Sequence, residues 1–216
     1  MQKSSFLFFL IIAATVGLAS YQAMYPLSAG IAFVRFLGLE AFLLLCVSLS
    51  IGPIAIINPS YAQLIEPRRA VGLAAFVLTV GHVLLAVSIE FNWQLAIALT
   101  QMSIIVSIVA GAIMTLLAIT SSDYAVKLLG AKNWKRVQSL NYPLFILSFA
   151  HFVLQSTGLF ATANGAMSIN LAELFAVLAG TAVVALQIWG ATTRMSRVKK
   201  PAENEQSHRE KPEAVI

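Results

Sequence analysis

Two histidines in apolar sequence, His82 and His151, are the residues of this chain best suited to chemistry. His82 follows Arg69 by 13 residues and His151 follows Gln138 by 13 residues, a rise of about 20 Å along a helix in each case. Two neutral imidazoles from different helices, facing each other at one depth, can ligate a haem iron axially. The residues alone leave a second interpretation equally open, in which each histidine only forms a hydrogen bond between helices.

The composition excludes an ordinary water-soluble globule. Of the 216 residues, 59% are hydrophobic and 11% are charged, whereas soluble domains carry about a quarter charged residues. The chain has 14 basic and 9 acidic residues, and ten of these charged residues lie in the segment 194–216. The longer sequence before this segment therefore carries few charges. Cys46 is the only cysteine, which excludes an intrachain disulfide and a cysteine-based metal site. We therefore predict a polytopic helical membrane protein.

Six apolar segments are each long enough to cross a bilayer as a helix. They cover residues 6–25, 31–57, 70–89, 95–119, 137–159 and 171–190. The predicted fold is all-α, a six-transmembrane-helix bundle over residues 1–193 followed by a disordered cytoplasmic tail over 194–216. The first segment, with Lys3 before it, also resembles a signal peptide, and cleavage there would leave five helices.

The basic residues between the segments predict the orientation of the chain, because basic residues that flank spans stay on the cytoplasmic side. They lie before the first segment, between the second and third, between the fourth and fifth, and after the sixth. We therefore expect a multi-pass protein of the inner (plasma) membrane with both termini in the cytoplasm. The net charge of +5 is then a signal of topology and lipid contact, not of nucleic-acid binding.

A few other polar residues lie inside the predicted spans, where ionisable groups are functional candidates by default. Arg35 and Glu173 lie near the predicted outer ends of their helices, and Glu40 lies deeper, where we expect a helix-packing hydrogen bond. Thr79 and Ser148 lie on the same helix faces as the two histidines. Either hydroxyl is a candidate partner for the second nitrogen of an imidazole.

Short motifs in the second to fifth segments carry a resemblance to a known family. They are Pro67-Arg68-Arg69-Ala70-Val71-Gly72-Leu73, Thr120-Ser121-Ser122-Asp123, Leu129-Gly130, Trp134-Lys135-Arg136 and Leu140-Asn141-Tyr142, together with the two histidines. With these motifs the chain resembles the ferric reductase-like transmembrane domain, and it is most similar to the haem-binding membrane subunit of periplasmic methionine sulfoxide reductase systems. The resemblance implies a six-helix bundle that carries electrons across the membrane through haem b, with His82 and His151 as its axial ligands.

The sequence departs from this pattern at the inner ends of two segments. Family members with two haems carry a second histidine pair there, and the corresponding residues here are Arg68 and Gln138. Arginine cannot ligate iron, so the resemblance implies one haem. Pro143 is expected to kink the fifth segment between Gln138 and His151. We also expect a basic cytoplasmic rim that binds haem propionates, anionic lipid or a partner, formed by Arg68, Arg69, Lys135 and Arg136.

The function implied is that of a haem b electron-transfer subunit that passes electrons to an acceptor at the outer face. The sequence contains no nucleotide-binding motif such as GxGxxG, so we expect a subunit without its own flavin or nicotinamide domain. Its electrons then come from a redox partner protein or from quinol. The competing class is a haem-free membrane assembly or transport subunit, in which His82 and His151 form structural hydrogen bonds.

Overall fold

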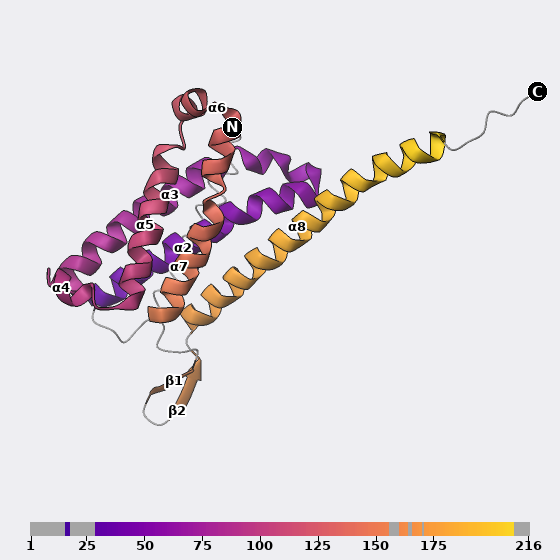
Figure 1. Cartoon of the computed structure of the whole chain (residues 1–216). Coiled ribbons are helices and arrows are strands. Elements are labelled where there is room, and N and C mark those ends of the chain that lie inside the picture. Colours follow the sequence, from indigo (N-terminus) through magenta and orange to yellow (C-terminus); the bar gives the residue numbers. More distant parts are fainter. Residues whose placement is uncertain (1–15, 18–28, 156–159, 164–165, 170, 210–216) are drawn as a thin grey trace, which may run out of the picture.

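A computed structural model describes residues 16–17, 29–155, 160–163, 166–169 and 171–209 (Figure 1). The long helices are α2 (Ala29–Ile57), α3 (Arg68–Leu85), α5 (Met102–Ile119), α6 (Asp123–Gln138), α7 (Asn141–Gln155) and α8 (Leu171–Arg209). The shorter helical elements are a 3-10 helix (Pro59–Ile65), a π-helical turn (Ala86–Glu90) and α4 (Leu95–Ala98). Strands β1 (Phe160–Ala163) and β2 (Ala166–Ile169) pair antiparallel.

Within these described residues, five helical stretches are long and apolar enough to cross a membrane. They correspond to the predicted second to sixth segments, so the chain is a multi-pass membrane protein of mainly helical fold. The predicted first span, 6–25, lies outside the described residues except for Val16 and Gly17, and so does the signal-peptide alternative.

Helix α2 lies at the centre of the bundle. Over half of its most apolar stretch is buried, 56%, against 11% to 22% in the other four spans, and α2 contacts α3, α7 and α8. The ring of Phe42 lies 6.0 Å, centroid to centroid, from the rings of Phe145, Phe149 and Phe152. Those three residues lie on one face of α7, and each aromatic pair adds about 0.5–1.5 kcal/mol beyond burial. This contact fixes α7, and with it His151, against α2.

The structure corrects the prediction of one continuous fifth helix. Helix α6 ends at Gln138 and α7 begins at Asn141, because the intervening residues form a turn in which the Ser139 N–H donates to the carbonyls of Lys135 and Arg136. Pro143 therefore lies in the first turn of α7, where its missing N–H removes no helical hydrogen bond. It helps to start a helix rather than to kink one.

Two further differences concern the ends of predicted helices. The predicted helical fold is confirmed for the described spans, and the connection before α8 adds two short strands, β1 and β2, which pair with Phe160 opposite Ile169. Helix α8 also continues to Arg209, into the segment where the composition predicted disorder. Continuing a helix that already exists needs no new nucleation, and glutamate, lysine and glutamine are good helix formers.

The two ends of the bundle differ in character. Helix α6 lies at one end and α4 lies at the opposite end (Figure 1); we name these the α6 end and the α4 end. Helices α3 and α7 both start at the α6 end, and α2 and α5 both finish there. The α6 end carries the basic residues Lys127, Lys132, Lys135 and Arg136. His82 lies in the last turn of α3 and His151 in the second half of α7, both toward the α4 end.

Candidate functional site

The two histidine rings meet across the interior of the bundle. Their centroids lie 6.4 Å apart and their planes are inclined at 73°. His82 comes from α3 and His151 from α7, and both side chains line one cavity. The matched depth predicted from the sequence therefore brings the two imidazoles together in space.

Each imidazole is held by a backbone carbonyl of a neighbouring helix. His82 Nδ1 lies 2.8 Å from the carbonyl oxygen of Val34 in α2, and His151 Nδ1 lies 2.9 Å from that of Ser103 in α5. A carbonyl oxygen only accepts hydrogen bonds, so Nδ1 carries the proton in both rings and the lone pair is on Nε2. A ring nitrogen with a free lone pair, oriented by a hydrogen bond at the other nitrogen, is the usual state of a metal-bound histidine.

These carbonyls replace the hydroxyl partners expected from the sequence. The Thr79 hydroxyl donates to the Ala75 carbonyl within its own helix, 2.9 Å away, and is not the partner of His82. Ser148 lines the cavity, but the partner of His151 is the Ser103 carbonyl. No sequence signal could have found Val34 or Ser103, because every residue has a backbone carbonyl.

The spacing of the rings fits one metal ion between them. Two imidazoles that hold a metal ion from opposite sides, with metal–nitrogen bonds of about 2.0–2.1 Å and a ring radius of about 1.1 Å, have centroids about 6.3 Å apart. The observed separation is 6.4 Å. No group of three or more histidine, cysteine, aspartate or glutamate side chains that could hold a metal occurs among the described residues. Two facing imidazoles can hold a metal ion whose other positions are filled by a planar macrocycle.

The cavity that contains the rings has a volume of about 570 Å³, within the usual range of cofactor pockets, about 300–1,000 Å³. Its lining toward the α6 end is apolar and includes Leu45, Met114 and Leu144. Its lining toward the α4 end mixes apolar residues such as Phe91 and Leu99 with the polar residues Arg35, Glu90, Gln155 and Glu173. A ligand with a large apolar body and a polar edge matches this lining.

Arg35 is the one arginine among the described residues that line the cavity, and no lysine is among them. It lies half-buried in the second turn of α2, close to the polar mouth. Among the described residues its guanidinium forms no ion pair with a carboxylate. A half-buried cation at the edge of an apolar cavity is a suitable partner for an anionic group of a bound molecule.

The structure places Arg68 and Arg69 away from this cavity. The guanidinium of Arg69 donates to the carboxylate of Asp123 at 2.7 Å. Arg68 lies beside Gly52 of α2. Neither arginine, nor Lys135 or Arg136, is among the residues that line the histidine cavity.

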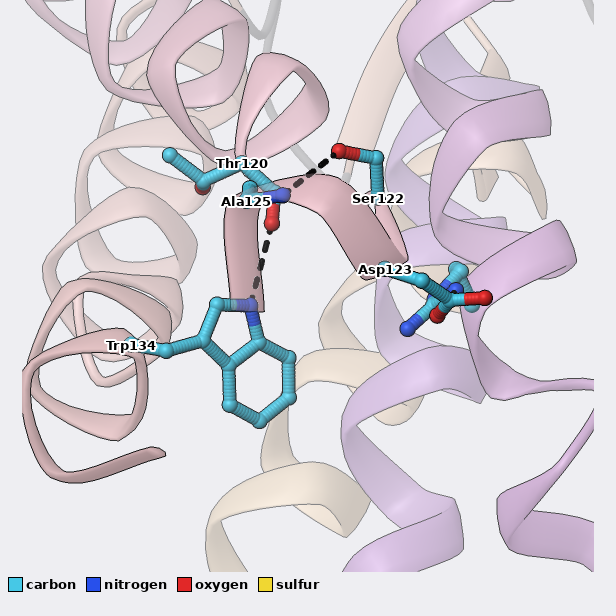
Figure 2. A network of polar contacts seen from close by, with 6 residues as sticks. Thr120, Ser122, Asp123, Ala125 and Trp134 are labelled. Atoms are coloured by element: carbon cyan, nitrogen blue, oxygen red, sulfur yellow. Dashed lines mark hydrogen bonds and ion pairs between the residues drawn. The ribbon is translucent and has the colours of Figure 1, made fainter. Parts of the chain in front are cut away.

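The motif Thr120-Ser121-Ser122-Asp123 joins helices at the α6 end. The Ser122 hydroxyl caps α6 by accepting from the Ala125 N–H at 3.1 Å, and the Trp134 indole donates to the Thr120 carbonyl at 3.0 Å (Figure 2). Gln138 also donates to the Thr120 hydroxyl, at 3.3 Å. The motif therefore ties both ends of α6 to the end of α5, and Gln138 belongs to this contact.

Comparison with known proteins identifies the family. Residues 37–149 match the family described as ferric reductase like transmembrane component. The matched stretch begins in α2 and ends in α7, so it includes His82 and stops two residues before His151. It covers slightly more than half of the chain.

Curated relatives cover similar stretches. The magnetosome protein MamZ of Paramagnetospirillum magneticum is 35% identical over 131 residues, which are 58% of this chain but 20% of that protein. The protein-methionine-sulfoxide reductase heme-binding subunit MsrQ of Polaromonas naphthalenivorans is 30% identical over 59% of each chain. MsrQ of Brucella ovis is 26% identical over 79% of this chain and 72% of that protein. This chain thus matches only about a fifth of the magnetosome relatives. The match to the family and the similarity to MsrQ proteins confirm the resemblance seen in the motifs, and the chain belongs to the ferric reductase-like transmembrane component family.

Proposed function

We propose that this chain is a transmembrane electron-transfer subunit that binds one haem b between α3 and α7, with His82 and His151 as axial ligands. The observation that carries the proposal is the pair of imidazoles, each with Nδ1 bound to a carbonyl and Nε2 free, at the spacing that one metal ion needs. Haem supplies reversible one-electron chemistry when bound. The residues of this chain supply its ligation, its orientation and an apolar surround.

The relatives support the same function. The MsrQ proteins are named as heme-binding subunits of a protein-methionine-sulfoxide reductase, and the family is described as a ferric reductase-like transmembrane component. Because the MsrQ relatives are named as subunits, a separate redox protein is the expected partner, with membrane quinol as the other candidate donor.

The division of the cavity supports one orientation of the haem. Arg35 would pair with a propionate carboxylate at the α4 end, and Leu45 and Met114 would contact the apolar part of the macrocycle. Arg35 thus takes the propionate role that the sequence suggested for Arg68 and Arg69. Those two residues remain at the basic α6 end, where we assign them to membrane orientation and to contact with anionic lipid.

We further propose that the α6 end faces the cytoplasm, that both termini are cytoplasmic, and that the membrane is the inner (plasma) membrane. The basic residues of α6 support this orientation. A reporter fused after Ile216 should then be cytoplasmic, and one inserted near Asn164 should be external. An external C-terminal reporter would reverse the orientation.

This orientation places the haem site near the outer face. His82 lies 14 residues after the start and eight before the end of the helical stretch Arg68–Glu90, so it lies about 21 Å of helix rise from the inner end and about 12 Å from the outer end. An acceptor at the outer face can approach closely. Quinol in the bilayer or an external partner is favoured as donor over a soluble cytoplasmic flavoprotein, because Arg68 and Gln138 offer no inner haem ligands.

The visible spectrum of the purified protein tests the proposal. A haem with two histidine ligands gives sharp low-spin bands after reduction by dithionite, and we expect these bands. A purified, folded protein with no haem bands after expression with sufficient haem would favour the haem-free assembly or transport subunit.

A further inference from the structure

We propose that Gly38 is the positioning residue for His82, because only the absence of a side chain at this position lets the imidazole reach the carbonyl that orients it. This inference rests on the proposed haem function for its consequence. The contact between Gly38 and His82 belongs to the protein alone. It can therefore be tested whether or not haem is bound.

Among the described glycines of α2 and α3, Gly38 is the one whose added Cβ would lie nearest to atoms of another element. A Cβ atom built on Gly38 would lie 2.8 Å from Cε1, 2.9 Å from Nδ1 and 3.3 Å from Nε2 of His82. The first two distances are shorter than Cβ contacts in real proteins, so an alanine requires something to shift. The imidazole therefore lies directly on the backbone of α2.

The position of Gly38 on the helix explains why this residue matters to the hydrogen bond. Gly38 follows Val34 by four residues, which places it one turn farther along the same face of α2. The Val34 carbonyl, which accepts from His82 Nδ1 at 2.8 Å, therefore points toward the space above Gly38. A side chain at position 38 would occupy the place where the ring now lies.

Other described glycines near the site do not have this role. Gly81 precedes His82, yet a Cβ there would only meet Leu37 at an ordinary 3.7 Å, and a Cβ on Gly111 would meet nothing within 4 Å. Among the glycines in the described part of the chain, Gly38 is the one that faces an imidazole. Gly81 is therefore a matched control on the neighbouring helix.

An alanine at position 38 should disturb the metal site by moving His82. Restoring ordinary contact distances requires the ring to move by about 0.5 Å, more than the tolerance of about 0.2 Å for a metal–ligand bond. The same movement lengthens the hydrogen bond between Nδ1 and the Val34 carbonyl. Both changes weaken the bond from His82 to the iron and leave His151 in place.

The first experiment compares Gly38→Ala with Gly81→Ala in the haem-loaded full chain. We expect Gly38→Ala to lose most of its haem or to convert the low-spin spectrum to a high-spin mixture, with a changed midpoint potential. Gly81→Ala should keep the spectrum and the potential of the parent protein. Unchanged haem content, spin state and potential in Gly38→Ala would overturn the inference and leave the proposed function intact.

The second experiment is a double-mutant cycle in melting temperature, with and without His82. Alanine is the better helix former, so Gly38→Ala should raise the melting temperature in the His82→Ala background, where no ring is in its way. It should lower the melting temperature when His82 is present. A change of the same sign and size in both backgrounds would overturn the inference.

The cycle separates the two proposals. If the parent protein binds no haem, the proposed function fails. The change in melting temperature caused by Gly38→Ala, compared with and without His82, still tests the role of Gly38. If Gly38→Ala alone does not fold, the inference predicts that Gly38→Ala with His82→Ala folds as well as His82→Ala. Failure of the double variant where His82→Ala folds would contradict it.

Discussion

The two ends of the bundle differ at corresponding positions, which are His82 and His151 toward the α4 end and Arg68 and Gln138 at the α6 end. Toward the α4 end, His82 and His151 meet with centroids 6.4 Å apart at a cavity. At the α6 end, Gln138 donates to the Thr120 hydroxyl, and Arg68 lies beside Gly52. The α4 end thus brings together two imidazoles from α3 and α7, whereas at the α6 end the corresponding residues, at the start of α3 and the end of α6, form structural contacts.

The difference shows what distinguishes a cofactor site from a polar helix contact. At the α4 end, each imidazole uses one nitrogen for a backbone carbonyl and keeps the other free beside a large cavity. At the α6 end, the Trp134, Gln138 and Asp123 side chains each form a hydrogen bond to a neighbouring residue. The first arrangement directs imidazole nitrogens, which are good iron ligands, to a cavity.

Removal of either imidazole is expected to have the largest effect. His82→Ala or His151→Ala should abolish the low-spin spectrum and most of the bound haem, because one axial ligand remains in an apolar cavity. Haem content per purified chain is the measurement. Gln138→Ala, the matched change at the α6 end, should retain most of the haem. Equal losses in all three variants would remove the distinction between the two ends.

Substitution of Arg35 sharpens the comparison between the cationic residues. Hydrogen bonds to charged groups contribute about 1.5–3 kcal/mol, so Arg35→Leu should weaken haem binding by about 10- to 100-fold. Transfer of haem to an apoprotein acceptor measures this loss. Arg69→Leu, which removes a residue outside the cavity, should leave haem transfer unchanged. A larger loss of haem affinity in Arg69→Leu than in Arg35→Leu would indicate that the propionates bind at the α6 end.

Substitution in the α6 contact should have the smallest effect and should spare the haem. Trp134→Phe removes the hydrogen bond to the Thr120 carbonyl while keeping an aromatic ring, so we expect a loss of about 0.5–1.5 kcal/mol in the free energy of unfolding. Thermal or denaturant unfolding in detergent measures it. A loss of the low-spin spectrum in this variant would show that the α6 end contributes directly to the haem site.

The features that depend on hydrophobicity and charge could be predicted from the sequence. The apolar stretches around α2, α3, α5, α7 and α8 are long enough to cross a membrane, and their length is a property of single segments. The meeting of His82 and His151 agrees with the similar depth predicted from their spacing, although the turn after Gln138 interrupts the helix along which the second distance was counted.

The contacts made by the backbone could not be predicted. The carbonyls of Val34 and Ser103 carry no signature in residue type, and the space above Gly38 exists only because α3 crosses α2 at that point. The break between Gln138 and Asn141 was not predicted, although three of its four residues, Gln138, Ser139 and Asn141, are polar. Arg35 was placed near an outer helix end from sequence, but its position on the cavity depends on helix packing.

The number of haems per chain tests the central claim most directly. Haem quantified against protein in the purified full chain should give a ratio of one, with a low-spin spectrum that depends on both His82 and His151. A ratio of two would show that the α6 end, with Arg68 and Gln138, also holds a haem. A ratio of zero in folded, haem-supplied protein would show that the two imidazoles are structural.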